Sequence, residues 1–206
     1  MQSNNSDAIK KSNRQNLLLV FAVFALPVVV ATLMYVTGWK PSATGNHGVL
    51  IQPARFIEEI SMQSADGKPV KFSELHGKWT MVYFDTSMCP EECEKQLYNM
   101  RQTHIAQGKD QERIQRLFIL NDTQAVDTLK SKLAGYPDML VWVGEKSVLT
   151  RLSQDFGIEA NKTTEQGSIY LVDPMGNLMM RYSPGIDPAG MRKDLVRLLK
   201  YSSEKQ

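Results

Sequence analysis

The sequence holds only two cysteines, Cys89 and Cys93, and they are separated by Pro-Glu-Glu. Thiolates act as nucleophiles, redox centres and soft metal ligands, so a close pair can form a disulfide or hold a thiophilic metal. The plain alternative is two buried structural cysteines. The spacing disfavours it, because both thiols fall one turn apart at the start of a predicted helix. We therefore take Cys89 and Cys93 as the candidate catalytic and metal-binding residues.

The three-residue gap limits what this pair can do. On a regular helix the Cβ atoms of residues i and i+4 lie about 5–6 Å apart, whereas a disulfide needs about 3.5–4.5 Å. A disulfide therefore requires Cys89 to leave the helix or the first turn to distort. Two sulfurs on one metal can sit roughly 4 Å apart, with metal–sulfur bonds of about 2.3 Å for zinc, and soft thiolates favour Cu(I). A metal site and a redox disulfide both remain open.

The elements around the pair predict which thiol is the more reactive. Trp79–Phe84 is a continuous apolar run, typical of a strand buried on both faces, and Pro90–Ala106 predicts the helix that follows it. Unpaired amides at a helix N-terminus lower the pKa of a nearby thiol, which favours Cys89. Three acidic residues follow in the first turn: Glu91, Glu92 and Glu94. They oppose thiolate formation, although acidic side chains there also simply complement the helix dipole.

The rest of the C-terminal part alternates between apolar strands and helices, which indicates an α/β fold with helices on both faces of a mixed sheet. A hairpin is predicted around Asp66-Gly67 and a helical turn at Phe72–Leu75. The further strands are predicted at Leu117–Leu120, Met139–Val143, Ser168–Val172 and Leu178–Tyr182, the last two antiparallel across the turn Asp173–Asn177. The further helices are predicted at Gln124–Leu133, Val148–Phe156 and 187–201.

An uncharged apolar segment, Leu17–Val36, precedes this domain. As a helix its twenty residues span roughly 30 Å, the hydrocarbon thickness of a bilayer, and they predict a transmembrane anchor. A cleaved signal peptide and a buried core helix are the alternatives, but no A-x-A site follows and no polar face is present. The basic residues Lys10, Lys11 and Arg14 precede the segment, so the N-terminus is expected in the cytoplasm and the rest across the membrane.

Charge and composition complete the domain layout. Formal net charge is only +2 and its excess lies at the N-terminus, which does not favour nucleic-acid binding. Residues 38–55 are rich in Gly, Pro, Ser and Asn and are interpreted as a tether and lead-in. The predicted layout is a cytoplasmic N-terminus at 1–16, the transmembrane helix at 17–36, a linker at 37–49, a domain at 50–202 and a tail at 203–206.

The strand, the C-P-x-x-C motif, the helix and the later stretch S-I-Y-L-V-D-P-M-G-N resemble the Sco/SenC family. The resemblance covers about residues 50–202 plus the anchor. It implies a thioredoxin-like mixed sheet, a role in cytochrome c oxidase assembly, and an inner membrane, bacterial or mitochondrial, with the domain on the periplasmic or equivalent side. It also implies copper binding by Cys89 and Cys93, with a histidine seven residues before the D-P dipeptide. That position holds Gln166, a poor ligand for Cu(I).

Other soft or basic ligands are not obvious replacements for that histidine. His47, His76 and His104 are each interpreted as surface residues. Met88 adjoins Cys89 and could supply a thioether, but packing is the more ordinary role of methionine. The group Met175, Met179 and Met180 is interpreted as core or turn filler. The chain also lacks the proline that thioredoxins place before the strand facing their cysteines, and Gln166-Gly167 stands there instead.

Three functions follow from these observations. The first is an assembly factor for a respiratory copper oxidase, acting as copper carrier or as reductant of copper-site cysteines. Its partners would be the copper-bearing oxidase subunit or other assembly factors, and copper is its candidate ligand. The second is a general extracytoplasmic thiol–disulfide oxidoreductase, in which Cys89 attacks and Cys93 resolves. The third is a non-catalytic membrane scaffold, so whether the chain is an enzyme stays open.

Overall fold

A computed structural model describes residues 4–38, 45–158 and 167–203, which divide into two compact units, Met1–Gly45 and Asn46–Gln206. The first unit contains helix α1 (Asn4–Thr37). Its portion Asn16–Thr37 is long and apolar enough to cross a membrane, and none of its apolar window is buried within the structure. The predicted apolar helix is confirmed as a candidate membrane span. The alternative of a buried core helix is wrong, because the apolar side chains of the span face outward.

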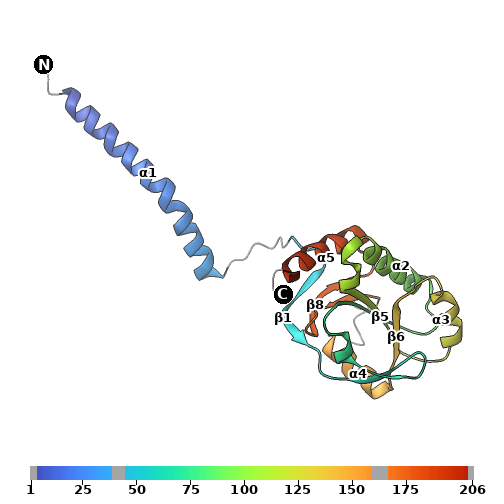
Figure 1. Cartoon of the computed structure of the whole chain (residues 1–206). Coiled ribbons are helices and arrows are strands. Elements are labelled where there is room, and N and C mark those ends of the chain that lie inside the picture. Colours follow the sequence, from blue (N-terminus) through green and yellow to red (C-terminus); the bar gives the residue numbers. More distant parts are fainter. Residues whose placement is uncertain (1–3, 39–44, 159–166, 204–206) are drawn as a thin grey trace. The chain divides into compact units, whose positions relative to one another are not determined.

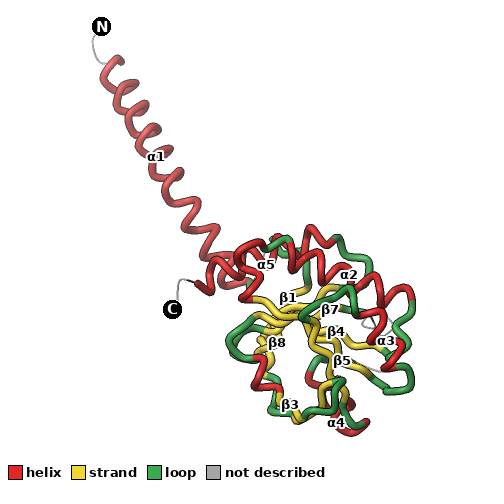
Figure 2. Tube along the Cα trace, turned by 45° about the vertical axis from the view of Figure 1, so that its right-hand side comes forward, coloured by secondary structure: helices red, strands yellow, loops and turns green. Residues whose placement is uncertain are grey.

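The second unit is built on one eight-stranded mixed sheet with the order β1-β8-β7-β4-β5-β6-β2-β3 (Figures 1 and 2). β4 and β6 are parallel to β5 between them, and the other pairs are antiparallel. The strands are β1 (Val49–Phe56), β2 (Ser61–Ser64), β3 (Pro69–Lys71), β4 (Trp79–Asp85), β5 (Ile114–Leu120), β6 (Met139–Val143), β7 (Ile169–Val172) and β8 (Asn177–Tyr182). The predicted mixed α/β sheet is confirmed.

Helices cover both faces of this sheet. The helices are α2 (Glu91–Ile105), α3 (Val126–Leu133), α4 (Lys146–Asp155) and α5 (Pro188–Ser203), with short 3-10 turns η1 (Phe72–Leu75) and η2 (Gly108–Arg113). Alternate side chains of β4 point to opposite faces. Met81 and Tyr83 join a core with α2, α3 and α5, whereas Val82 and Phe84 join one with η1 and α4. α2 and α5 lie side by side (Figure 1).

Most predicted elements occur where the sequence places them. Every residue of β4 before Asp85 is buried, as expected for a central strand, and β6 has its predicted bounds. The hairpin β2–β3 and the antiparallel pair β7–β8 also occur. Residues 38–55 are not simply a tether, however, because β1 extends the sheet beyond β8. The side chains of β1 are mostly exposed. Its sequence therefore did not need the run of apolar residues by which the buried strands were predicted.

A buried carboxylate on α5 hydrogen-bonds the residues just before β1 and so attaches the first strand of the domain to its last helix. Asp194 of α5 is 2% exposed and accepts the backbone N–H of His47 at 2.9 Å and that of Gly48 at 2.9 Å. The ring Nδ1 of His47 lies 3.2 Å from the same carboxylate. Burial, with Asp194 beside it, raises the pKa of the Tyr182 hydroxyl. His47 is exposed, as predicted for a surface residue, and its contacts with Asp194 also help to attach β1 to α5.

Asp194→Ala is expected to lower the free energy of unfolding by about 2–4 kcal/mol, because two backbone N–H groups lose a charged acceptor. Urea unfolding of the full chain in mild detergent, followed by tryptophan fluorescence, measures this loss. Asp110→Ala is the matched control, since Asp110 pairs with Arg113 on the surface and such pairs contribute less than about 1 kcal/mol. Equal losses in the two variants would contradict the role given to Asp194.

Candidate functional site

Cys89 and Cys93 form a disulfide at the junction between β4 and α2, with their Cα atoms 5.1 Å apart. Cys89 lies before the helix with a φ of 41°, in the left-handed region, and Pro90 is the N-cap of α2. Left-handed backbone costs a non-glycine residue about 1–2 kcal/mol. Cys93 sits in the first turn of α2. The pair is therefore joined in the way the spacing requires, with Cys89 off the helix.

Neither cysteine is exposed in this disulfide state. Both are 0% exposed and pack in the same core as Leu97 and Met100 of α2. Met88, directly before the pair, is 67% exposed, so it is not the packing residue that the sequence indicated. Pro90, on the other side of Cys89, is exposed as well. The disulfide is therefore enclosed within the protein, directly after the turn that starts at Thr86.

Two hydrogen-bonded groups at the strand ends support this turn. Ser87 is buried, and its hydroxyl donates to Asp122 Oδ1 while accepting the backbone N–H of Ala125 at 2.8 Å. The bond from Ser87 lowers the pKa of the Asp122 carboxyl. Asp122 follows β5, the parallel neighbour of β4, so both loops leave the same edge of the sheet. The β5–α3 connection is therefore part of the site.

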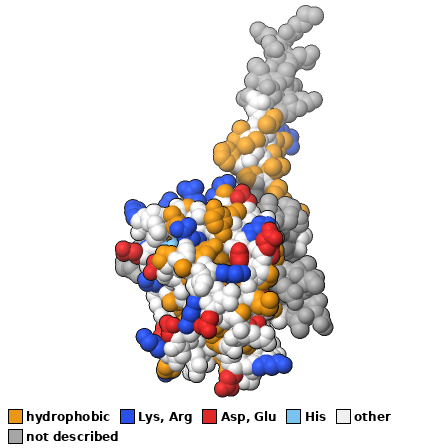
Figure 3. All heavy atoms as spheres, turned by 90° about the vertical axis from the view of Figure 1, so that its right-hand side faces the viewer, with side chains coloured by type: hydrophobic (Ala, Val, Ile, Leu, Met, Phe, Trp, Pro, Cys, Tyr) orange, Lys and Arg blue, Asp and Glu red, His pale blue; other side chains and the backbone are white. Residues whose placement is uncertain are grey.

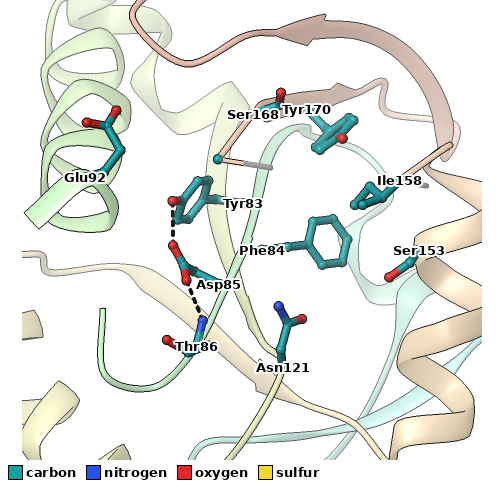
Figure 4. A pocket seen from close by; sticks show the side chains of 11 residues that line it. Tyr83, Phe84, Asp85, Thr86, Glu92, Asn121, Ser153, Ile158, Ser168 and Tyr170 are labelled. Atoms are coloured by element: carbon teal, nitrogen blue, oxygen red, sulfur yellow. Dashed lines mark hydrogen bonds between the residues drawn. The ribbon is translucent and has the colours of Figure 1, made fainter. Parts of the chain in front are cut away.

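A cavity of ≈ 450 Å³ lies at the carboxyl end of β4, and neither cysteine is among its lining residues (Figure 4). Tyr83 donates its hydroxyl to Asp85 Oδ2 at 2.8 Å, and Asp85 Oδ1 accepts the N–H of Thr86 at 2.7 Å. Burial, followed by the nearby Asp85, raises the pKa of the Tyr83 hydroxyl, so it stays protonated. Glu92 of α2 lines the same cavity. The remaining lining residues are Phe84, Asn121, Ser153, Ile158, Gly167, Ser168 and Tyr170.

Sequence reasoning missed Tyr83, Asp85, Ser87 and Asp122. Only Asp85 gave a signal, as an acidic residue that ends an otherwise apolar strand. The three glutamates of α2 do occupy its first turn, as expected for complementing the helix dipole. On the face seen in Figure 3, acidic and basic side chains are interspersed over the domain.

The candidate third ligands are scattered. Gln166 lies outside the described residues. His76 is exposed, and its ring lies next to Gly176. His104 is half-buried, and its ring Nε2 lies 3.0 Å from the carbonyl oxygen of Gln111. Burial lowers the pKa of His104, which is thus more enclosed than predicted. Of the methionines, Met175 is exposed, Met179 half-buried and Met180 buried. Among the described residues, no group of three His, Cys, Asp or Glu side chains could hold a metal ion.

Residues 79–202, more than half of the chain, match the family model described as the transmembrane-like, thioredoxin-like, C-terminal domain. The chain belongs to this family. The matched region begins with β4 and ends in α5, so it contains the disulfide and the loops that support it. The thioredoxin-like fold expected from the sequence is confirmed.

Individual relatives support the resemblance to the Sco/SenC proteins. A Stutzerimonas stutzeri protein named as copper-binding is 28% identical over 72% of this chain and 72% of its own length. The mitochondrial SCO1 homolog 2 of Arabidopsis thaliana is 27% identical over 59% of this chain, which spans 45% of that relative. Yeast Sco1 with copper bound has the same fold, with a TM-score of 0.61 and 21% identity over 73% of this chain and 95% of Sco1.

Ser87→Ala is expected to lower the stability of this thioredoxin-like domain by about 1–2 kcal/mol at pH 7. The folded pKa of Asp122 lies below the unfolded value of about 3.9. The Ser87 bond therefore contributes fully above pH 3.9 and is lost as the pH falls through the lower folded pKa. The difference in melting temperature between variant and wild type should shrink between about pH 4 and pH 2.

Ser131→Ala is the control for this measurement, since within the described part of the chain its hydroxyl donates to the uncharged carbonyl of Asp127 at 3.5 Å. Its difference from wild type should not change with pH. A Ser87→Ala difference that stays constant down to pH 2 would contradict a bond to an ionised Asp122.

Proposed function

We propose that the chain is a membrane-anchored, thioredoxin-like assembly factor for a respiratory copper oxidase, and that it works through reversible reduction of Cys89–Cys93. The observation that carries this proposal is the disulfide itself, placed at the strand–helix junction with Cys89 outside the helix. The relatives named for Sco1 and for copper binding support the oxidase pathway. The favoured partner is the copper-bearing oxidase subunit, whose cysteines must be reduced before they bind metal.

The proposed reaction is a thiol–disulfide exchange that starts from the reduced pair. The Cys89 thiolate attacks a partner disulfide, forms a mixed disulfide and releases one partner thiolate, which takes up a proton. The Cys93 thiolate then attacks the sulfur of Cys89, closes the Cys89–Cys93 disulfide and releases the second partner thiolate, which also takes up a proton. The partner gains two electrons and the pair loses two. Because the pair ends the reaction oxidised, an external dithiol must return two electrons to it before the next cycle.

The anchor and its direction belong to the same proposal. The basic residues before the apolar segment favour an N-terminus in the cytoplasm and a domain on the opposite side, the periplasm in bacteria or its mitochondrial equivalent. In the layout proposed from the sequence, the N-terminus, the anchor, the linker and the domain follow one another along the chain. The cysteine pair would then lie on the side of the membrane where oxidase copper sites are assembled. A general oxidoreductase would share this topology and chemistry, and would differ in accepting unrelated disulfides.

A reduced Cys93→Ser variant is expected to form a stable mixed disulfide with an oxidised copper-site domain of the oxidase subunit, because the resolving thiol is missing. Non-reducing electrophoresis and mass spectrometry of the adduct measure this, and Cys89→Ser is the matched control. An adduct that forms mainly with Cys89→Ser would reverse the assigned roles. Equal trapping of unrelated disulfides would favour the general oxidoreductase. Full oxidase activity in membranes that carry Cys89→Ser/Cys93→Ser would leave only the scaffold function.

Copper transfer is the second candidate function, and the relative named for copper binding favours it. The fit of this chain to Cu(I) is partial. Reduction of the disulfide would free two soft thiolates, and the described residues hold no cluster that completes a site with them. The resemblance to the Sco/SenC family implies a third ligand at position 166, where this chain has glutamine.

Gln166→His is accordingly expected to raise the Cu(I) affinity of the reduced chain by at least about tenfold. Removing a residue that only hydrogen-bonds a metal ligand already changes metal affinity by about tenfold or more, and a direct ligand should matter at least as much. Competition against a Cu(I) chelator of known affinity measures this change. Gln154→His, an exposed position on α4, is the control and should leave the affinity unchanged. If the wild type already binds as tightly as Gln166→His, position 166 does not limit binding and a different third ligand operates.

A further inference from the structure

Lys132 of α3 contacts the turn that carries Cys89, although 43 residues separate them. Its ammonium group donates to the carbonyl oxygen of Cys89 at 3.0 Å and to that of Met88 at 3.2 Å. The same nitrogen lies 2.6 Å from Glu94 Oε1 in the first turn of α2. One side chain thus links α3, the turn and α2 on both sides of the disulfide.

The two carbonyls that Lys132 contacts belong to the residues just before and at the left-handed position. Left-handed backbone at Cys89 is unfavourable by itself, so the turn needs interactions that compensate for it. Within the turn, the Cys89 N–H donates to the carbonyl of Thr86 at 3.2 Å. The carbonyls of Met88 and Cys89 precede the helix and are not part of its hydrogen-bond ladder. Lys132 therefore supplies charge-assisted donors where the turn needs them.

The charge of Lys132 is largely balanced. Glu94 lies against it, and Glu91 and Glu92 carry further negative charge in the same helical turn. The Lys132 and Glu94 side chains are 37% and 51% exposed, so water screens the field that reaches the sulfurs. A lysine so neutralised acts on the pair mainly through the geometry it enforces, and only weakly by stabilising a thiolate.

We propose that Lys132 is a positioning residue that stabilises the closed, buried disulfide by holding the turn at Cys89, and so sets how readily the pair is reduced. This inference rests on the reversible Cys89–Cys93 chemistry proposed above. When the disulfide opens, Cys89 is free to leave the left-handed region and no longer requires the Lys132 contacts. The contacts therefore favour the oxidised form over the reduced form.

Lys132→Met tests this proposal in the full chain in detergent. The equilibrium between the disulfide and the dithiol is measured in glutathione buffers by thiol alkylation and mass spectrometry. Removal of the donors is expected to shift this equilibrium about tenfold toward the dithiol, which is about 30 mV for a two-electron couple. Reduction by dithiothreitol should also be faster, because the turn beside the buried sulfurs is held less firmly.

Three further variants separate position from charge and from folding. Lys132→Arg keeps a charged donor and should restore much of the wild-type equilibrium. Glu94→Gln removes the carboxylate that orients Lys132 and should shift the equilibrium in the same direction, by less. Lys130→Met, two residues away on α3 and paired with Asp66 at 3.6 Å, should change nothing. The melting temperature of each reduced variant shows whether the domain has stayed folded.

Other results would overturn the proposal. An unchanged equilibrium in Lys132→Met would mean that the contacts do not distinguish the two redox forms. A shift toward the disulfide, with a raised pKa of the Cys89 thiol, would mean that Lys132 stabilises the thiolate instead. Either failure leaves the proposed function intact as long as Cys93→Ser traps the partner. Conversely, the glutathione shift stands as a property of the pair even if no oxidase partner is trapped.

Discussion

A disulfide between residues four apart does not close across a regular helical turn, and this constraint shapes everything near Cys89. The residue meets it by leaving α2 and adopting a φ of 41°. Pro90, the N-cap of α2, has no backbone donor to satisfy, and the preceding residues form a tight turn beside the two buried cysteines. That turn has unfavourable backbone and carbonyls outside any regular element. Groups outside the motif must therefore stabilise it.

The sheet supplies those groups because of the way its central strands are paired. β4 and β5 are parallel, so the loops that follow them leave the same edge. The loop after β4 carries the cysteines, and the connection after β5 carries Asp122 and leads into α3. Asp122 of that connection bonds Ser87, and Lys132 in the last turn of α3 bonds the carbonyl of Cys89. A thioredoxin-like fold thus holds its redox turn between two neighbouring loops, with α2 as only one of its supports.

Local patterns predicted the elements and the pair, but not this support. The apolar run of β4, the bounds of β6 and the antiparallel β7–β8 pair follow from hydrophobicity and turn residues alone. β1 escaped prediction because an exposed edge strand is defined by its hydrogen bonds to β8, which no local pattern encodes. Lys132 escaped for a related reason. On the sequence it is one more basic residue near the end of an amphipathic helix, and only the parallel pairing of β4 with β5 brings it to Cys89.

The buried disulfide also constrains how the two proposed activities relate to each other. Copper binding and partner reduction both begin from free thiolates, so neither starts from the closed pair. If the chain reduces a partner, the disulfide is its product, and if it carries copper, the disulfide is its empty and inactive form. An interaction that stabilises the closed turn therefore favours partner reduction, which forms the disulfide, and opposes copper binding and the return to the dithiol. The closed pair would not react with other thiols or bind metals until a reductant opens it. The stability of the turn at Cys89 would then set how readily the dithiol forms, from which either reaction begins.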